Sequence, residues 1–377
     1  MADLYWPGDE RAGDHFSQRA LVTTMLAVEA DWLGHDLDVA VAVDDLVDDL
    51  AAAAEAGGNP VIPLVRLLRE AHPDAHRGLT SQDVVDSALM RMAAVAVADL
   101  RRDLATVGQR LADLAEVHRD TPMVARTLTQ HAVPTTFGFR VAAWLTAVLD
   151  ADEDLARLSF PQQLAGAAGT RAAFVELGRG VPDDLPRWHT TRAPVTRLGD
   201  ALAGVTDACA RIANDVLVMS RPELAELAEG VGGGSSTMPG KANPTLSVLV
   251  RRAALTTPQL AATLHLAAAQ QVDDRADGGW HAEWATLRDL VRRTLVAASQ
   301  TRDLVTGLRV DTGRMAATLA AAGEAVLAEQ RSMAAAAGHE PAPSYLGDAG
   351  AYVDAVVARA RRTEFEHHHG HEHEEER

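Results

Sequence analysis

Residues 246–271, LSVLVRRAALTTPQLAATLHLAAAQQ, form the stretch that decides the fold class. The segment is apolar almost all round a helical projection, and its main charges are Arg251 and Arg252. A helix of this kind belongs in the middle of a bundle or at a subunit interface, because it has no continuous polar face. The stretch therefore predicts a fold of packed helices.

The neighbouring segments have the same helical character. Residues 102–118, 137–158 and 281–308 read as long helices, and 202–219 carries a clear apolar face. That face steps by three or four residues through Val205, Cys209, Ile212, Val216 and Met219. The sequence lacks strand-like alternation and repeats of 20–50 residues. The expected fold class is all-α.

Clusters of glycine, proline and aspartate separate the helices and indicate loops. We expect an N-terminal helical domain over 1–100, a central helical bundle over 101–305 and a short C-terminal helical domain over 306–362. Residues 363–377, TEFEHHHGHEHEEER, are charged and histidine-rich, which predicts a disordered, solvated tail. Weak binding of a divalent metal by the tail histidines is the alternative, and no other metal site is expected.

Composition limits the function. The chain of 377 residues has a formal net charge of −18, which disfavours nucleic-acid binding because phosphate backbones would be repelled. Cys209 is the single cysteine, so no intramolecular disulfide is expected. The N-terminus does not resemble a signal peptide, and no run of about 18 apolar residues predicts a membrane span. We expect a cytoplasmic protein.

Three polar stretches interrupt the alanine-rich background. In HRGLTSQD, residues 76–83, Thr80 or Ser81 can cap the following helix with Asp83 in its first turn. The same helix start is suited to bind a carboxylate, and the two interpretations are compatible. In RTLTQHAVPTT, residues 126–136, polar side chains crowd a predicted loop before an apolar helix. They indicate a polar pocket, although a lone histidine is more often structural.

The third stretch is GGGSSTMPGKANP, residues 232–244, which we call the signature loop. A phosphate-binding loop requires glycine, four residues and then Gly-Lys-Ser/Thr. Here Ser235 stands in the first glycine position and Ala242 follows Lys241, so the pattern fails at both ends. We predict instead a mobile loop that closes Ser235 and Lys241 over a substrate.

Together the three stretches resemble the fumarase/aspartase superfamily, whose signature GSSxMPxKxNP is matched by residues 234–244 at every fixed position. The resemblance extends from about residue 7 to about residue 360. It implies a long helical bundle flanked by two small helical domains. It also implies a homotetramer in which three subunits each supply one motif to every active site. No cofactor is implied.

The resemblance also implies the site residues. A base, Ser235, removes a proton alpha to a carboxylate, while Lys241 and Asn243 bind substrate carboxylate. His76 and His131 are expected to orient substrate or carry the proton, with His189 as a further candidate. The expected substrate is a small anionic polycarboxylate. The full substrate-binding set is Thr80, Ser81, Gln82, Arg126, Thr129, Gln130, Ser236, Met238, Lys241, Asn243, Arg192 and Arg275.

The branch of the superfamily is indicated by Leu128, because many of its lyases have histidine at this position. A bulky apolar residue followed by Gln-His-Ala is similar to the 3-carboxy-cis,cis-muconate cycloisomerases, as are PRWHTTR at 186–192 and GGWHAEW at 278–284. Trp280 and Trp284 in the latter are either characteristic of that group or simple packing anchors. The implied reaction is reversible lactonisation of 3-carboxy-cis,cis-muconate. The alternatives are another carbon–nitrogen or carbon–oxygen lyase and a non-enzymatic scaffold, which the intact signature disfavours.

Overall fold

The computed structural model describes residues 3–38, 41–180, 185–234, 236–238, 240–275 and 277–374, with side chains described to residue 362. The chain divides into two compact units. The first unit comprises Met1–Leu100, Leu155–Ala203 and Thr256–Val296, and the second comprises Arg101–Asp154, Gly204–Leu255 and Ala297–Arg377. Each unit is built from three separate stretches of the chain, whereas the predicted domains are consecutive. The division into three domains stays a prediction.

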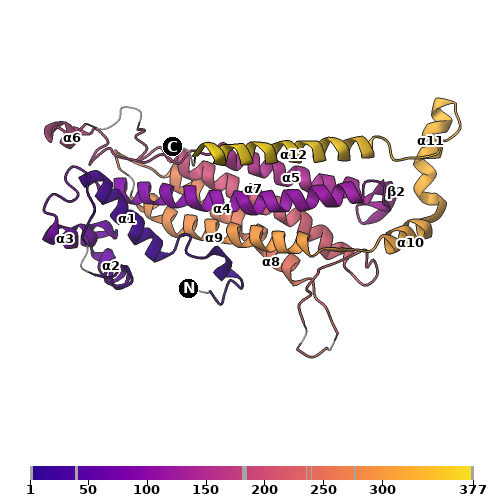
Figure 1. Ribbon diagram of the computed structural model, residues 1–377, viewed down its shortest axis with the longest axis horizontal. Helices are drawn as coiled ribbons and strands as arrows, with labels where there is room; N and C mark the ends of the chain where they lie inside the picture. The colour runs from indigo at the N-terminus through magenta and orange to yellow at the C-terminus, as the bar shows by residue number, and fades with distance from the viewer. Residues whose placement is uncertain are drawn as a thin grey trace. The chain divides into compact units, whose positions relative to one another are not determined.

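Helices dominate the described residues, which confirms the all-α fold class (Figure 1). The α-helices are α1 (Gln18–Leu33), α2 (Val43–Gly57), α3 (Val61–Ala71), α4 (Ser81–Val117), α5 (Phe137–Ala156), α6 (Ala172–Glu176), α7 (Ala193–Met219), α8 (Thr245–Ala269), α9 (Gly278–Thr306), α10 (Thr312–Ala322), α11 (Ala328–Ala337) and α12 (Ala349–Glu374). Two short 3₁₀ helices are η1 (Asp9–Ala12) and η2 (Gly323–Leu327).

Apolar periodicity located the long helices correctly. All five residues of the apolar face predicted in 202–219 are buried in α7. They recur every three or four positions, so they lie on one side of the helix. The apolar stretch at 246–271 forms α8, but the helix is not buried all round. Leu255 is 70% exposed and Leu266 is 66% exposed on it. Both locations predicted for α8, the middle of a bundle and a subunit interface, stay predictions.

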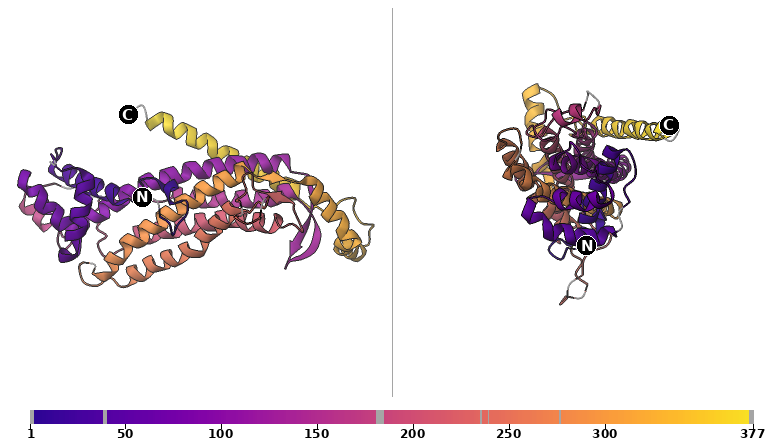
Figure 2. Two further views of the ribbon diagram at one scale, coloured as in Figure 1. Left: turned by 90° about the horizontal axis from the view of Figure 1, so that it is seen from below. Right: turned by 90° about the vertical axis from the view of Figure 1, so that its left-hand side faces the viewer.

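In the first unit, α1, α2 and α3 pack together in sequence order (Figure 2). Their contact faces carry fully buried apolar side chains, including Met25, Leu46, Leu64 and Leu68. Pro63 near the start of α3 is compatible with the helix because the first turn has amides that lack helical partners in any case. This group of helices positions the loop at 72–80 and the start of α4.

In the second unit, α12 runs alongside α5, shown in yellow and magenta in Figure 1. The Tyr352 hydroxyl lies 2.9 Å from Thr146 Oγ1, and Arg359 Nη2 donates to Asp150 at 2.7 Å. The backbone of α12 is helical to Glu374, so the helix enters the stretch for which we expected a disordered tail. The glutamates there have good helix propensity, and no proline interrupts residues 363–374. Residues 375–377 lie outside the described residues.

Four short strands were not predicted. In the second unit, β1 (Pro122–Thr127) and β2 (Gln130–Thr136) pair as an antiparallel hairpin with a register irregularity between Val124 and Arg126. β3 (Leu227–Ala228) and β4 (Arg309–Val310) form a two-residue antiparallel pair. The second polar stretch is therefore a β-hairpin and not a loop, because Met123 and Val124 are buried and the backbone groups pair across the strands.

Candidate active site

The first predicted motif lies at the start of α4 in the first unit. The Thr80 amide donates to the carboxylate of Asp83, which lies in the first turn of α4, at 3.1 Å. A cap made by the Thr80 or Ser81 side chain stays a prediction. Asp83 also accepts from the amides of Ala165 and Gly166 at 3.0 and 2.9 Å. Thr80 is buried, while Ser81, the first residue of α4, is partly exposed. The helix start is thus rigid and presents Ser81.

Gln82 and His76 flank this start in different ways. Gln82 is buried and its Nε2 donates to the His189 carbonyl at 2.8 Å. His76 has a backbone φ of +63°, which is unfavourable for a residue with a Cβ. The buried carboxylate of Glu29 holds it there, accepting from the His76 amide at 3.0 Å and contacting the ring Nδ1 at 2.6 Å. The second ring nitrogen, Nε2, does not contact Glu29.

Behind the helix start lies a cluster of ionisable residues that we call the buried polar cluster: Asp83, Asp86, His189, Arg192 and Glu283. His189 Nε2 lies 2.9 Å from Asp83 Oδ1. Arg192 donates to Asp86 at 2.7 and 3.0 Å and its Nε lies 3.0 Å from Glu283 Oε1. Each charge therefore faces an opposite charge or a hydrogen-bond donor, as buried charges require.

Two of the three carboxylates in the cluster, Asp86 and Glu283, share the one guanidinium of Arg192. Burial acts to lower the pKa of Arg192, but attraction to Asp86 and hydrogen bonds to both carboxylates raise it above its usual value. Burial raises the pKa of Glu283, and Asp86 adds to this effect, although Arg192 acts in the opposite direction. Glu283 therefore takes up a proton at a higher pH than an ordinary glutamate does.

Arg192 was predicted to bind substrate, and this geometry does not agree with that role. Its side chain is 2% exposed, and all three guanidinium nitrogens already donate to Asp86, Glu283 or backbone carbonyls. Trp280 is a packing anchor of the same cluster, since its buried Nε1 donates to Asp86 at 2.9 Å and its ring meets Trp284 at 4.6 Å. Asp86 and Glu283 were not predicted as part of the site. The spacing of Asp83 and Asp86 on one helix face was the signal in the sequence that could have indicated Asp86.

Arg275 belongs to the same unit but not to this cluster. It is partly exposed, and its Nε is buried without a hydrogen-bond partner among the described residues. A role in substrate binding stays a prediction for Arg275.

The second predicted motif occupies the hairpin of the second unit. Leu128 and Thr129 form its two-residue turn, with φ of +47° and +71°. A turn with positive φ at both central positions favours Asn-Gly, so leucine there is strained, and its side chain is 95% exposed. Thr129, Gln130 and His131 are also exposed. The strained turn thus presents one apolar and several polar side chains to the outside of this chain.

Arg126 lies on the same hairpin and is engaged inside the unit. Its two terminal nitrogens donate to the two oxygens of the fully buried Glu226, at 2.9 and 2.7 Å. This paired geometry is the strongest form of arginine–carboxylate contact. Arg126 therefore anchors the hairpin, and the prediction that it binds substrate does not agree with the structure.

The third predicted motif, the signature loop, stands on a short backbone bridge. Gly233 and Asn243 exchange two amide–carbonyl hydrogen bonds of 2.8 Å. A Cβ at Gly233 would lie 1.9 Å from Thr245 Oγ1, so any larger residue there would force Thr245 to move. The Asn243 side chain donates to the Gly234 carbonyl at 3.2 Å and so helps to close the base of the loop.

Beyond this bridge the loop is open to solvent. Ser236, Met238 and Lys241 are exposed, and Ser235 and Pro239 lie outside the described residues. The buried carboxylate of Glu229 accepts from the amides of Leu246 and Ser247 at 3.1 and 2.7 Å, which fixes the start of α8 directly after the loop. Lys241 is also the only lysine in the whole chain.

The predicted site residues thus fall into two groups. His76, Thr80, Ser81, Gln82, Arg192 and Arg275 belong to the first unit, and the hairpin and signature-loop residues belong to the second. Within the described residues, no cluster of three or more histidine, cysteine, aspartate or glutamate side chains is arranged to hold a metal ion. The same part of the chain contains no helix that is both long and apolar enough to cross a membrane.

Comparison with known proteins gives the family. The lyase family matches residues 35–256. A nitrosuccinate lyase from Streptomyces davaonensis is 39% identical over 74% of this chain and 66% of its own length. A 3-carboxy-cis,cis-muconate cycloisomerase from Bradyrhizobium diazoefficiens is 40% identical over 76% of this chain and 70% of its own length. The chain therefore spans about two thirds of the length of these relatives.

A solved structure shares the fold. The β-carboxy-cis,cis-muconate cycloisomerase from Acinetobacter calcoaceticus superposes with a TM-score of 0.77, covering 92% of this chain and 97% of that chain at 23% identity. The matched fold agrees with the helical architecture described above. The chain is an enzyme that belongs to the lyase family of the fumarase/aspartase superfamily.

Proposed function

We propose that the protein is a 3-carboxy-cis,cis-muconate cycloisomerase that interconverts this tricarboxylate and its lactone. The observation that carries the proposal is the hairpin turn, where Leu128 projects an apolar side chain beside Gln130 and His131. Many other lyases of the superfamily have a histidine at the position of Leu128. The 40% identical cycloisomerase relative supports the same assignment.

The proposed chemistry needs no exchange of electrons. In the lactonising direction a substrate carboxylate oxygen adds to one alkene carbon while the neighbouring carbon takes up a proton. In reverse, Ser235 removes that proton alpha to a carboxylate, and the lactone carboxylate leaves. Negative charge develops on the activated carboxylate, and the ammonium of Lys241 is suited to stabilise it.

Composition supports a specific task for Lys241. The chain uses arginine at every other basic position outside histidine, so the one ammonium group falls in the signature loop. An ammonium is a compact point charge on a flexible stem, whereas a guanidinium is a planar fork. A loop that closes over the substrate and brings a cation to a carboxylate favours the ammonium group.

We further propose that the active site is shared between copies of the chain. The hairpin turn and the signature loop are exposed in the isolated chain, although catalysis of this kind works best away from water. Leu255 and Leu266 are exposed apolar side chains of α8. A homotetramer could cover these side chains and surround both motifs, and light scattering after size exclusion should find four copies.

The direct test is turnover of 3-carboxy-cis,cis-muconate, followed as loss of diene absorbance. The purified chain should consume it, and Ser235→Ala should abolish turnover while the thermal midpoint stays unchanged. Absence of turnover by the native chain, or full activity of Ser235→Ala, would overturn the assignment.

A second candidate is supported by the 39% identical nitrosuccinate lyase. The same proton abstraction, with nitrite rather than a carboxylate as the leaving group, would convert nitrosuccinate into fumarate. Nitrosuccinate should therefore be assayed in parallel for released nitrite. A kcat/KM for nitrosuccinate above that for carboxymuconate would move the assignment to this reaction.

Shared sites can be tested by mixing two inactive variants. Ser235→Ala and Gln130→Ala remove residues of different motifs, so a mixed tetramer regains some sites with both residues intact. Activity should return after the two variants are unfolded and refolded together, but not after either is refolded alone. No recovery despite mixed assembly would place both motifs of one site on one chain.

A further inference from the structure

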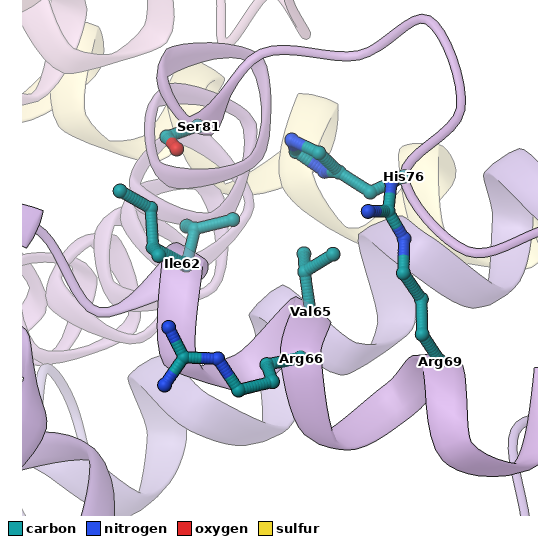
Figure 3. A pocket seen from close by; sticks show the side chains of 7 residues that line it. Ile62, Val65, Arg66, Arg69, His76 and Ser81 are labelled. Atoms are coloured by element: carbon teal, nitrogen blue, oxygen red, sulfur yellow. The ribbon is translucent and has the colours of Figure 1, made fainter. Parts of the chain in front are cut away.

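A pocket of about 410 Å³ opens in the first unit between α3 and the start of α4 (Figure 3). Arg66 and Arg69 extend from adjacent turns of α3 along two of its sides. The His76 ring and the Ser81 hydroxyl lie along another. The pocket thus includes two residues that the sequence placed in the active site, together with two arginines that it did not.

The charge of the pocket is positive in a strongly acidic chain. None of the residues that line it is acidic, and the chain as a whole carries −18. Arg66 is exposed and makes no hydrogen bond or ion pair with any described residue. Arg69 donates from Nε to the Ala75 carbonyl at 3.2 Å, which leaves its terminal nitrogens directed at the pocket region. Arg66 therefore brings an uncompensated charge to this pocket.

The floor of the pocket is apolar. Val61 and Val65 are buried beneath the pocket, and Ile62 is partly open to it. Glu29 occupies the backbone amide and Nδ1 of His76, so the ring keeps one orientation beside Ser81. A cationic rim, an apolar floor and a fixed polar wall suit a ligand with a carboxylate on a short carbon skeleton.

We propose that this pocket binds one carboxylate end of the substrate and that Arg66 is a specificity-determining residue for it. The proposal rests on the proposed function in that the substrate is a small polycarboxylate. A charge-assisted hydrogen bond from an otherwise unpaired arginine holds a carboxylate without first breaking an internal ion pair. Arg66 differs in this respect from Arg126 and Arg192, which are already paired.

The test compares Arg66→Gln with Arg66→Lys and with Arg110→Gln, an exposed arginine of α4 that does not line the pocket. Arg66→Gln should raise the KM for carboxymuconate about tenfold or more and change kcat less than about threefold, because the contact holds substrate and transition state alike. Arg66→Lys should recover part of the loss, and Arg110→Gln should match the native chain. An unchanged KM in Arg66→Gln would overturn the proposal.

A binding measurement separates this proposal from the proposed reaction. Tricarballylate, a saturated tricarboxylate that cannot lactonise, should raise the thermal midpoint of the native chain and of Arg110→Gln but not of Arg66→Gln. That result would support the pocket even if carboxymuconate were not turned over. Equal stabilisation of all three proteins would overturn the pocket while leaving the reaction untouched.

Discussion

The buried polar cluster and the hairpin turn use polar side chains in opposite ways. In the cluster, Asp86, Arg192 and Glu283 are buried and each is paired with another member. At the turn, Gln130 and His131 are exposed, and the backbone beside them is strained. Charge that is satisfied inside the chain stabilises the fold, whereas polar groups left outside on a strained turn are available for binding and catalysis. Substitutions can break or sharpen this contrast.

The largest expected effect is on stability, at the centre of the cluster. Arg192→Leu leaves two buried carboxylates facing each other without a cation, so the free energy of unfolding should fall by about 3–5 kcal/mol. Urea denaturation measures the change. Arg197→Leu, an exposed position on α7, is the matched control and should change stability by no more than about 0.5 kcal/mol. Equal effects of both would contradict a structural role for the cluster.

The next effect is on activity alone. Lys241→Met removes the only ammonium of the signature loop, and kcat/KM should fall about 10²–10³-fold with an unchanged denaturation midpoint. Lys241→Arg keeps the charge but not its shape, and should also lose activity. Because the chain has one lysine, an amine-directed reagent should inactivate it with substrate protecting. A fully active Lys241→Met variant would remove this loop from the mechanism.

A substitution at Leu128 in the hairpin turn should raise stability and lower activity. Leu128→Gly relieves the positive φ, so the free energy of unfolding should rise by about 1 kcal/mol. The same change removes the exposed side chain and should lower kcat/KM by about tenfold. Denaturation and steady-state kinetics measure the two quantities. Undiminished activity would show that the Leu128 side chain has no part in the reaction.

The smallest effect is a pH dependence within the cluster. Burial raises the pKa of Glu283. At a pH just above the usual carboxyl pKa, Glu283 is therefore still protonated in the folded chain but has lost its proton in the unfolded chain. Stability from this group therefore falls as pH rises through that window. Glu283→Gln cannot ionise, so its stability relative to the native chain should increase as pH is raised from about 4 to about 7. A difference independent of pH would contradict this assignment.

The sequence by itself determined the helices and the superfamily. The apolar face of α7 is a local pattern, and one helix face buries all of it. The fixed residues of GSSTMPGKANP are likewise contiguous, so the match to the superfamily needed no knowledge of the fold. The place of Asp83 in the first turn of α4 was also readable from the sequence, because it depends only on residues close together in the chain.

Only the tertiary structure decided which cations remain free to bind a substrate. Arg126 and Arg192 looked like carboxylate ligands in the sequence, but they are paired with Glu226 and Glu283, which are 100 and 91 residues away. Arg66 looked like an ordinary helix arginine, yet the fold leaves it unpaired at a pocket. A charge is available or consumed according to which distant carboxylate packs against it, and local spacing carries no record of that pairing.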